Sequence, residues 1–333
     1  FVFDNLISYI VFFSLLGFIH SINVSRMDET ESSGFYTKTF SQDAVNYIVA
    51  PVVLIATIFT VYYVNIPALF ANQTLIQAMS PQENNGGIEK NLALFKQVYS
   101  YKSFGDSEAT EQLVQIAIQI NSSDKLPANI KQQFVDLAKE KVTEKLKQTP
   151  NDARYLVFAG SFYNRINQYD EAIKYLDRAM IASPRKQSIY SELASSYLGK
   201  QNYQKMFDLL KQSYELAPEY KEAQILYALS ALYVKNKPLA VELLNKVGQD
   251  VIISDNRFLQ TYAAIGDYDS AVTILKVRLQ KDPKNAQYKL SLASLYMTMG
   301  QKQMAIDLIS QIIKDDPTFK DQGESYIKQI QNS

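Results

Sequence analysis

The stretch that decides the fold runs from Ala153 to Lys186 and reads ARYLVFAGSFYNRINQYDEAIKYLDRAMIASPRK. Its apolar residues recur at intervals of three and four, which is the spacing of one buried face of an amphipathic α-helix. The small residues Gly160 and Ala172 fall one in each half, and Pro184 follows the second half, where a proline ends a helix. The stretch therefore predicts two helices that cross closely.

Prolines mark the same point in further copies of this unit. Pro150, Pro184 and Pro218 are 34 residues apart, and so are Pro283 and Pro317. The interval from Pro218 to Pro283 is 65 residues, so one of the two repeats that it spans is three residues short. A period of 34 residues is that of the tetratricopeptide repeat (TPR), whose helix pairs stack into an α-solenoid.

The stretch from Ala153 to Lys186 also resembles a TPR at that family's signature positions, namely Gly160, Tyr163, Tyr169, Ala172, Ala179 and Pro184. Four further copies follow, and the third of the five lacks the closing proline. We predict a TPR solenoid over residues 151–333, with a capping helix over 320–331, because the last repeat of a stack needs a polar outer face. Residues 67–150 are expected to form irregular helices and degenerate repeats.

Two long uncharged windows precede the repeats. The first runs from Asn5 to Ser25, and the second is centred on Ile48 to Ile66. Each is close to the ~20 residues that an α-helix needs to cross the hydrocarbon layer of a bilayer. We predict two transmembrane helices that form a membrane hairpin over residues 1–66, with spans at about 5–22 and 46–66. A signal peptide is the alternative for the first window, although no Lys or Arg precedes it.

Two cations near the hairpin, Arg26 and Lys38, lie in the loop between the windows. Cytoplasmic loops of membrane proteins are enriched in Lys and Arg. We therefore expect this loop to be cytoplasmic and the repeats to be extracytoplasmic. His20, the single histidine, would then lie at the membrane interface as a neutral side chain rather than a catalytic one.

Composition narrows the chemistry of the chain. The 34 basic and 34 acidic residues cancel, so the positive footprint of a nucleic-acid-binding protein is missing. There is no Cys, and no Gly-rich phosphate loop, HExxH or GxSxG motif occurs in the sequence. We expect no nucleic-acid partner, no metal, no cofactor and no catalytic residue in this chain.

The candidate site is the concave face of the solenoid, where the first helix of each repeat turns polar side chains away from the second. This face is polar and mildly basic, which suits a protein partner, an extended peptide, a carboxylate terminus or a glycan. A solvated groove without a dedicated ligand is the alternative. The residues expected along it are Arg154, Asn164, Arg165, Lys186, Ser191, Ser195, Gln287 and Ser294.

The first 80 residues resemble part of the bacterial O-antigen ligase and polymerase family. The resemblance rests on the run Phe3-Asp4-Asn5-Leu6-Ile7, which leads into an apolar window, and on VNIPALFANQTLIQAM at residues 64–79. It implies that the chain is the C-terminal part of an inner-membrane glycan-transfer protein whose catalytic His and Arg lie upstream of Phe1. Its partners would include the bilayer and a glycan acceptor. The alternative is a complete membrane-anchored TPR scaffold without enzymatic activity.

Overall fold

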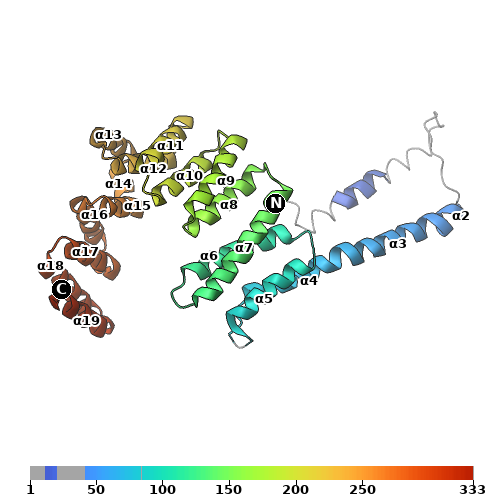
Figure 1. Cartoon of the computed structure of the whole chain (residues 1–333), viewed down its shortest axis with the longest axis horizontal. Coiled ribbons are helices and arrows are strands. Elements are labelled where there is room, and N and C mark those ends of the chain that lie inside the picture. Colours follow the sequence, from blue (N-terminus) through green and yellow to red (C-terminus); the bar gives the residue numbers. More distant parts are fainter. Residues whose placement is uncertain (1–11, 21–41, 84, 333) are drawn as a thin grey trace. The chain divides into compact units, whose positions relative to one another are not determined.

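A computed structural model describes residues 12–20, 42–83 and 85–332 (Figure 1). The described residues contain helices and no β-strand, which confirms the all-α fold class. The chain divides into two units, Phe1–Leu69 and Phe70–Ser333, and each is described separately below.

In the first unit, residues 12–20 are helical and leave apolar side chains exposed. The chain continues through α2 (Gln42–Ala44), a π-helical segment (Val45–Val49), α3 (Ala50–Thr60), a second π-helical segment (Val61–Asn65) and the start of α4 (Ile66–Met79).

Where the chain is described, no helix has both the length and the apolar character needed to cross a membrane. The expected transmembrane helix over 46–66 is not found as one α-helix, because π-helical segments occupy Val45–Val49 and Val61–Asn65. The α-helix between them, Ala50–Thr60, has 11 residues. It is about 16 Å long at 1.5 Å per residue, against a hydrocarbon layer of about 30 Å. Of the expected span over 5–22, residues 12–20 are described and helical, whereas residues 5–11 and 21–22 lie outside the described residues.

The second unit continues from α4 as a series of helices: α5 (Gly87–Ser100), α6 (Asp106–Ser122), α7 (Ala128–Gln148), α8 (Ala153–Arg165), α9 (Tyr169–Ala182), α10 (Gln187–Gly199), α11 (Tyr203–Leu216), α12 (Lys221–Tyr233), α13 (Lys237–Val247), α14 (Gln249–Ser254), α15 (Asn256–Ala264), α16 (Tyr268–Lys281), α17 (Ala286–Thr298), α18 (Lys302–Asp315) and α19 (Lys320–Asn332). The five repeats are the pairs α8–α9, α10–α11, α12–α13, α15–α16 and α17–α18, and each pair packs closely. We call the first helix of a pair helix A and the second helix B.

A left-handed turn residue separates helix A from helix B in all five repeats. These residues are Asn167, Gln201, Lys235, Gly266 and Gly300, with φ between 55° and 79°. Their spacing is 34, 34, 31 and 34 residues, so the missing three residues fall between the turns of the third and fourth repeats. The chain reverses direction there because a left-handed residue cannot continue a right-handed helix.

Small residues set how closely the helices approach. A Cβ added to Gly160 of α8 would lie 2.4 Å from Leu176 Cγ of α9, which confirms the predicted close crossing within the first repeat. Tyr163 stacks on Tyr175 inside that repeat, with ring centroids 5.5 Å apart. The ring of Tyr169 covers Gly199 of the next repeat, where an added Cβ would lie 2.2 Å from the ring.

The third repeat departs from the others at its end. It lacks a closing proline, and α13 ends instead at Gly248, whose φ of 92° and ψ of 146° suit only glycine. The short helix α14 follows and packs against α13, α15 and α16. Elsewhere helix B lies along the next helix A, as α9 does on α10 and α11 on α12, whereas α13 does not pack along α15 in this way.

Candidate functional site

The helix A side of the second to fourth repeats carries a pocket of about 220 Å³. We call it the helix-A groove. Most of its lining comes from helices α10, α12 and α15, and the residues are Ser191, Ala194, Ser195, Leu198, Met206, Leu210, Leu226, Leu229, Ser230, Tyr233, Arg257, Gln260 and Thr261. Residues from three successive repeats therefore meet at one site.

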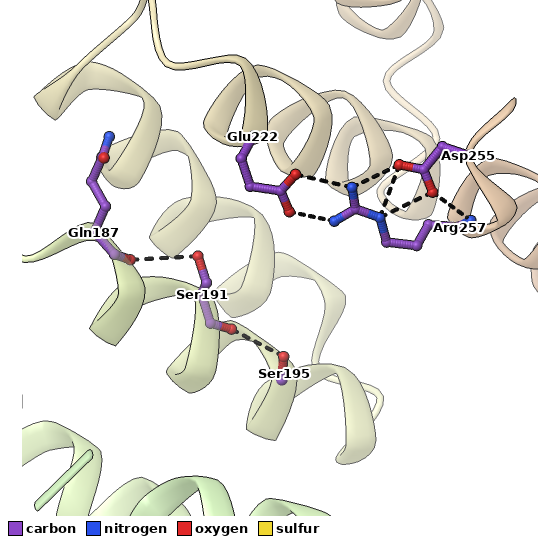
Figure 2. A network of polar contacts seen from close by, with 6 residues as sticks. All are labelled: Gln187, Ser191, Ser195, Glu222, Asp255 and Arg257. Atoms are coloured by element: carbon purple, nitrogen blue, oxygen red, sulfur yellow. Dashed lines mark hydrogen bonds and ion pairs between the residues drawn. The ribbon is translucent and has the colours of Figure 1, made fainter. Parts of the chain in front are cut away.

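One rim of the groove is a ladder of hydroxyls along α10 (Figure 2). Ser191 Oγ donates to Gln187 O at 3.4 Å, and Ser195 Oγ donates to Ser191 O at 3.0 Å. Residues four apart share a face of a helix, so the two serines lie on the same side of α10. Their hydroxyl hydrogens are used within the helix, and their oxygen atoms can still accept hydrogen bonds from a ligand.

The floor of the groove is apolar. Leu229 is buried, Leu226 is half-buried, and Leu198 at the end of α10 is 36% exposed. Tyr233 closes the floor and stacks on Tyr203 of α11, with ring centroids 5.1 Å apart. This floor can remove an apolar ligand side chain from water, which is the main source of affinity in such clefts.

The opposite rim is a network of three charged residues that joins α12 to α15 (Figure 2). Arg257 pairs with both carboxylate oxygens of Glu222, the Nη2–Oε2 distance being 3.0 Å. It also donates from Nη2 to Asp255 Oδ2 at 2.7 Å and from Nε to Asp255 Oδ1 at 3.1 Å. Asp255 caps α15 by accepting from the Arg257 backbone N–H at 2.9 Å.

The network favours the charged forms of Asp255 and Arg257. Hydrogen bonds from the Arg257 side chain lower the pKa of Asp255, and those to Glu222 and then Asp255 raise the pKa of Arg257. One guanidinium is thus paired with two carboxylates, which leaves the network with a net negative charge. At this part of the concave face the expected basic character is absent, because the cation is neutralised by its neighbours.

Sequence reasoning missed this network. Glu222 and Arg257 are 35 residues apart and come from neighbouring repeats, so no local pattern joins them. The available signal was Asp255 directly before Asn256 and Arg257, an acidic residue at a helix start that also lies two residues from a cation.

Of the eight residues predicted from the sequence, Ser191 and Ser195 line the helix-A groove. Asn164 is half-buried and used inside the solenoid. Its Nδ2 donates to Glu192 O at 2.9 Å, and its Oδ1 accepts from Ser196 Oγ at 2.6 Å, so it ties α8 to α10. Arg154 pairs with Glu111 of α6 at 3.7 Å.

Arg165, Lys186 and Gln287 are exposed, and their side chains make no hydrogen bond or ion pair with any described residue. Ser294 lines a separate pocket of about 490 Å³ between α17 and α19, together with Leu290, Met297 and Tyr326. The eight predicted residues are therefore divided among the groove, a second pocket, contacts inside the solenoid and open surface.

A second cluster of ionisable groups lies at the start of α6. One carboxylate oxygen of Asp106, Oδ1, is buried and has no hydrogen-bond partner among the described residues. Burial raises the pKa of Asp106, against the pull of Lys141 and Lys145. Burial also raises the pKa of Tyr99, whose ring lies 4.9 Å below Lys141 Nζ. A small recess lined by Thr110, Lys145 and Tyr155 adjoins this cluster.

In the part of the chain that the structure describes, no three His, Asp or Glu side chains gather in a way that could hold a metal ion. The groove itself offers hydroxyls, an amide, one guanidinium that is paired with carboxylates, and an apolar floor. This arrangement can bind but supplies no nucleophile paired with a base.

Comparisons with known proteins agree with the repeats. Two family models, both described as tetratricopeptide repeat, match residues 153–185 and 262–323. The chain therefore contains TPRs, as the sequence predicts, and TPRs generally bind protein or peptide partners.

Individual relatives are distant. Tetratricopeptide repeat protein 21A of Mus musculus is 25% identical over 55% of this chain, and the alignment spans 16% of that protein. A tetratricopeptide repeat protein from Parabacteroides merdae is 18% identical, with a TM-score of 0.45, over 67% of this chain and 89% of that one. YrrB, described as a TPR protein with an unusual peptide-binding site, is 16% identical, with a TM-score of 0.35, over 53% and 92%.

Proposed function

We propose that this chain is a protein-interaction module that binds an extended peptide segment of a partner in the helix-A groove. One observation carries the proposal, namely an apolar floor flanked by hydroxyls on α10 and by the ion network that joins α12 to α15. Exposed apolar floors with polar rims are the usual form of peptide-binding clefts, because the floor gives affinity and the rim fixes the orientation.

The chemistry of the groove favours an uncharged, apolar peptide segment. Arg257 is paired with Glu222 and Asp255, so it is not available as a clamp for a C-terminal carboxylate. Ser191 and Ser195 can accept from backbone N–H groups of the ligand, and Leu198 and Leu226 can cover one of its side chains.

A matched pair of leucines tests the site. Leu198 in the groove is 36% exposed and Leu216 outside it is 39% exposed, and both lie in the last turn of a helix. Peptides selected from a random library on the purified chain should lose about tenfold in affinity on Leu198→Gln, the cost of leaving one apolar contact unmade. Leu216→Gln should leave the affinity unchanged, as fluorescence anisotropy would show. Equal affinities for both variants would exclude the groove.

The proposal extends to the first unit. We propose that the chain is held at a bacterial inner membrane through residues 5–22 and 46–66, with the repeats outside the cytoplasm. The support is chemical. Residues 44–82 contain no charge, and several large apolar side chains of this stretch are exposed, among them Leu54 and Ile58 at 60% each. Tyr47 and Tyr62 stand towards the ends, where aromatic rings favour the interface.

Vesicle flotation tests the membrane proposal. The chain should float with vesicles of phosphatidylethanolamine and phosphatidylglycerol, and Leu54→Lys combined with Ile58→Lys should weaken flotation, because residues 5–22 would remain as the other anchor. The matched control is Ile181→Lys with Leu216→Lys, two exposed apolar residues of the repeats. A chain that stays unbound would refute the anchor.

In intact cells, an impermeant maleimide should label Ser188→Cys if the repeats are extracytoplasmic, since the chain has no other Cys.

The link to glycan transfer rests on the resemblance of the first 80 residues alone. Under it, the groove would recruit a partner or a glycan acceptor to a catalytic region encoded upstream. If the upstream coding sequence contains further apolar spans and a histidine next to Phe1, the transfer function becomes the hypothesis to test. If it does not, the anchored interaction scaffold is the function that stands.

A further inference from the structure

The joint between the third and fourth repeats is open on its helix B side. Two overlapping clefts of about 480 and 490 Å³ lie between α13 and α16. Both are lined by Val241, Leu244, Tyr262 and Ser270. At the regular joints this space is closed, because helix B packs along the next helix A.

One residue of the repeat explains much of the opening. Tyr169 covers Gly199 of the following helix A, and Tyr203 stacks on Tyr233 in the same way. Residues 169 and 203 are one period apart, and the next equivalent position is Lys237. Lys237 is exposed and lines one cleft, so the joint has no aromatic ring to fill it.

The opposite side of the same joint is held together. Glu222 of α12 pairs with Arg257 of α15, and these two helices pack on each other. Buried residues of α12, α13, α15 and α16 share one apolar core. The joint therefore has a closed helix A side and an open helix B side, and the helix-A groove crosses it from Ser195 to Gln260.

We propose that this joint is a hinge, about which the segment α15–α19 bends relative to α8–α13 and so sets the width of the helix-A groove. A solenoid is stiff only where neighbouring repeats interlock, because each repeat contacts only its neighbours. Here the direct contact of helix B with the next helix A is replaced by the short helix α14 and by two clefts into which helices can move, while the α12–α15 contact acts as the pivot. Only the link to ligand binding rests on the proposed function.

Distance measurements between spin labels test the hinge, and the Cys-free chain makes labelling specific. The pair Lys246→Cys with Lys276→Cys crosses the open joint. The control pair, Lys211→Cys with Lys246→Cys, crosses the regular joint before it. All three lysines are exposed and line neither cleft. The distance distribution across the open joint should be at least about twofold wider than the control, since less interface restrains it. Equal widths would overturn the hinge.

Two further variants give opposite expectations. Val241→Phe places a ring in both clefts and should narrow the distribution of the 246/276 pair, whereas Arg257→Gln removes the tie at the pivot and should broaden it. Neither should alter the 211/246 pair. Helical circular dichroism confirms that both variants fold. If neither changes the width, the hinge is wrong. A peptide selected on the groove should narrow the distribution, and a peptide that binds without narrowing it would refute the coupling while leaving the hinge intact.

Discussion

Two joints between neighbouring repeats differ in how tightly they are packed. One lies between the first and second repeats, and the other lies between the third and fourth. At the first, Tyr169 closes on Gly199 and Asn164 bonds to Glu192 and Ser196. At the second, the tyrosine is replaced by Lys237, a short helix is inserted, and charged side chains hold one edge. A repeat that loses three residues keeps its fold but loses its rigid connection to the next one.

The largest effect should come from filling the close approach inside the first repeat. Gly160→Ala should destabilise α8 and α9 by about 3 kcal/mol, because its Cβ would overlap Leu176. Gly248→Ala meets no neighbouring atom and should cost about 1 kcal/mol, through backbone strain at its positive φ. Amide hydrogen exchange measures each segment separately. If both substitutions reduce protection from amide exchange equally, the expected difference between Gly160 and Gly248 is contradicted.

The next largest effects should come from the hydrogen bonds of Asn164 and the ion pairs of Arg257. The stability that these two sets of contacts supply should respond differently to salt. Asn164→Ala should cost about 1–2 kcal/mol at any ionic strength, because it removes the half-buried hydrogen bonds that join α8 to α10. Arg257→Ala should cost at most about 1 kcal/mol, since the ion network is partly exposed and screened by solvent. Its cost should shrink as NaCl is raised. Melting temperatures at low and high salt measure the loss of stability that each substitution causes. If the loss caused by Arg257→Ala does not depend on salt, the result would argue against the ion network.

The smallest effects are those of pH. The pKa of Asp255 is lowered, so its carboxylate stabilises the fold above its unfolded pKa of about 3.9, and this stability is lost as pH falls through the lower folded value. Asp255→Asn should therefore lower the melting temperature at pH 7 and have little effect in acid.

Asp106 should show the opposite dependence of stability on pH. Its pKa is raised, so its contribution to stability is full below about pH 3.9 and is lost as pH rises through the folded pKa. Asp106→Asn should leave the melting temperature at pH 7 unchanged or slightly higher. Asp255→Asn and Asp106→Asn serve as controls for each other. If both change the melting temperature at pH 7 in the same direction, the causes assigned to the two pKa shifts are contradicted.

Much of the repeat architecture follows from local signals. The helix pairs and the shortened repeat are predicted from periodicity and proline spacing, and the close approach at Gly160 from the small residues, because these features depend on residues near one another in the chain. The groove was predicted less well. Ser191 and Ser195 lie on its rim, whereas Asn164 faces the neighbouring helix α10, and the rotation of one helix against the next decides this.

By itself, the sequence determined that the chain forms TPR helix pairs, since their spacing, turns and small residues are written into each 34-residue unit. Only the tertiary structure decided where Glu222 meets Arg257, where the apolar floor of the groove is exposed and which joint stays open. These features join residues of neighbouring repeats. Their contacts depend on the relative placement of whole helices, a quantity that no local pattern of residues encodes.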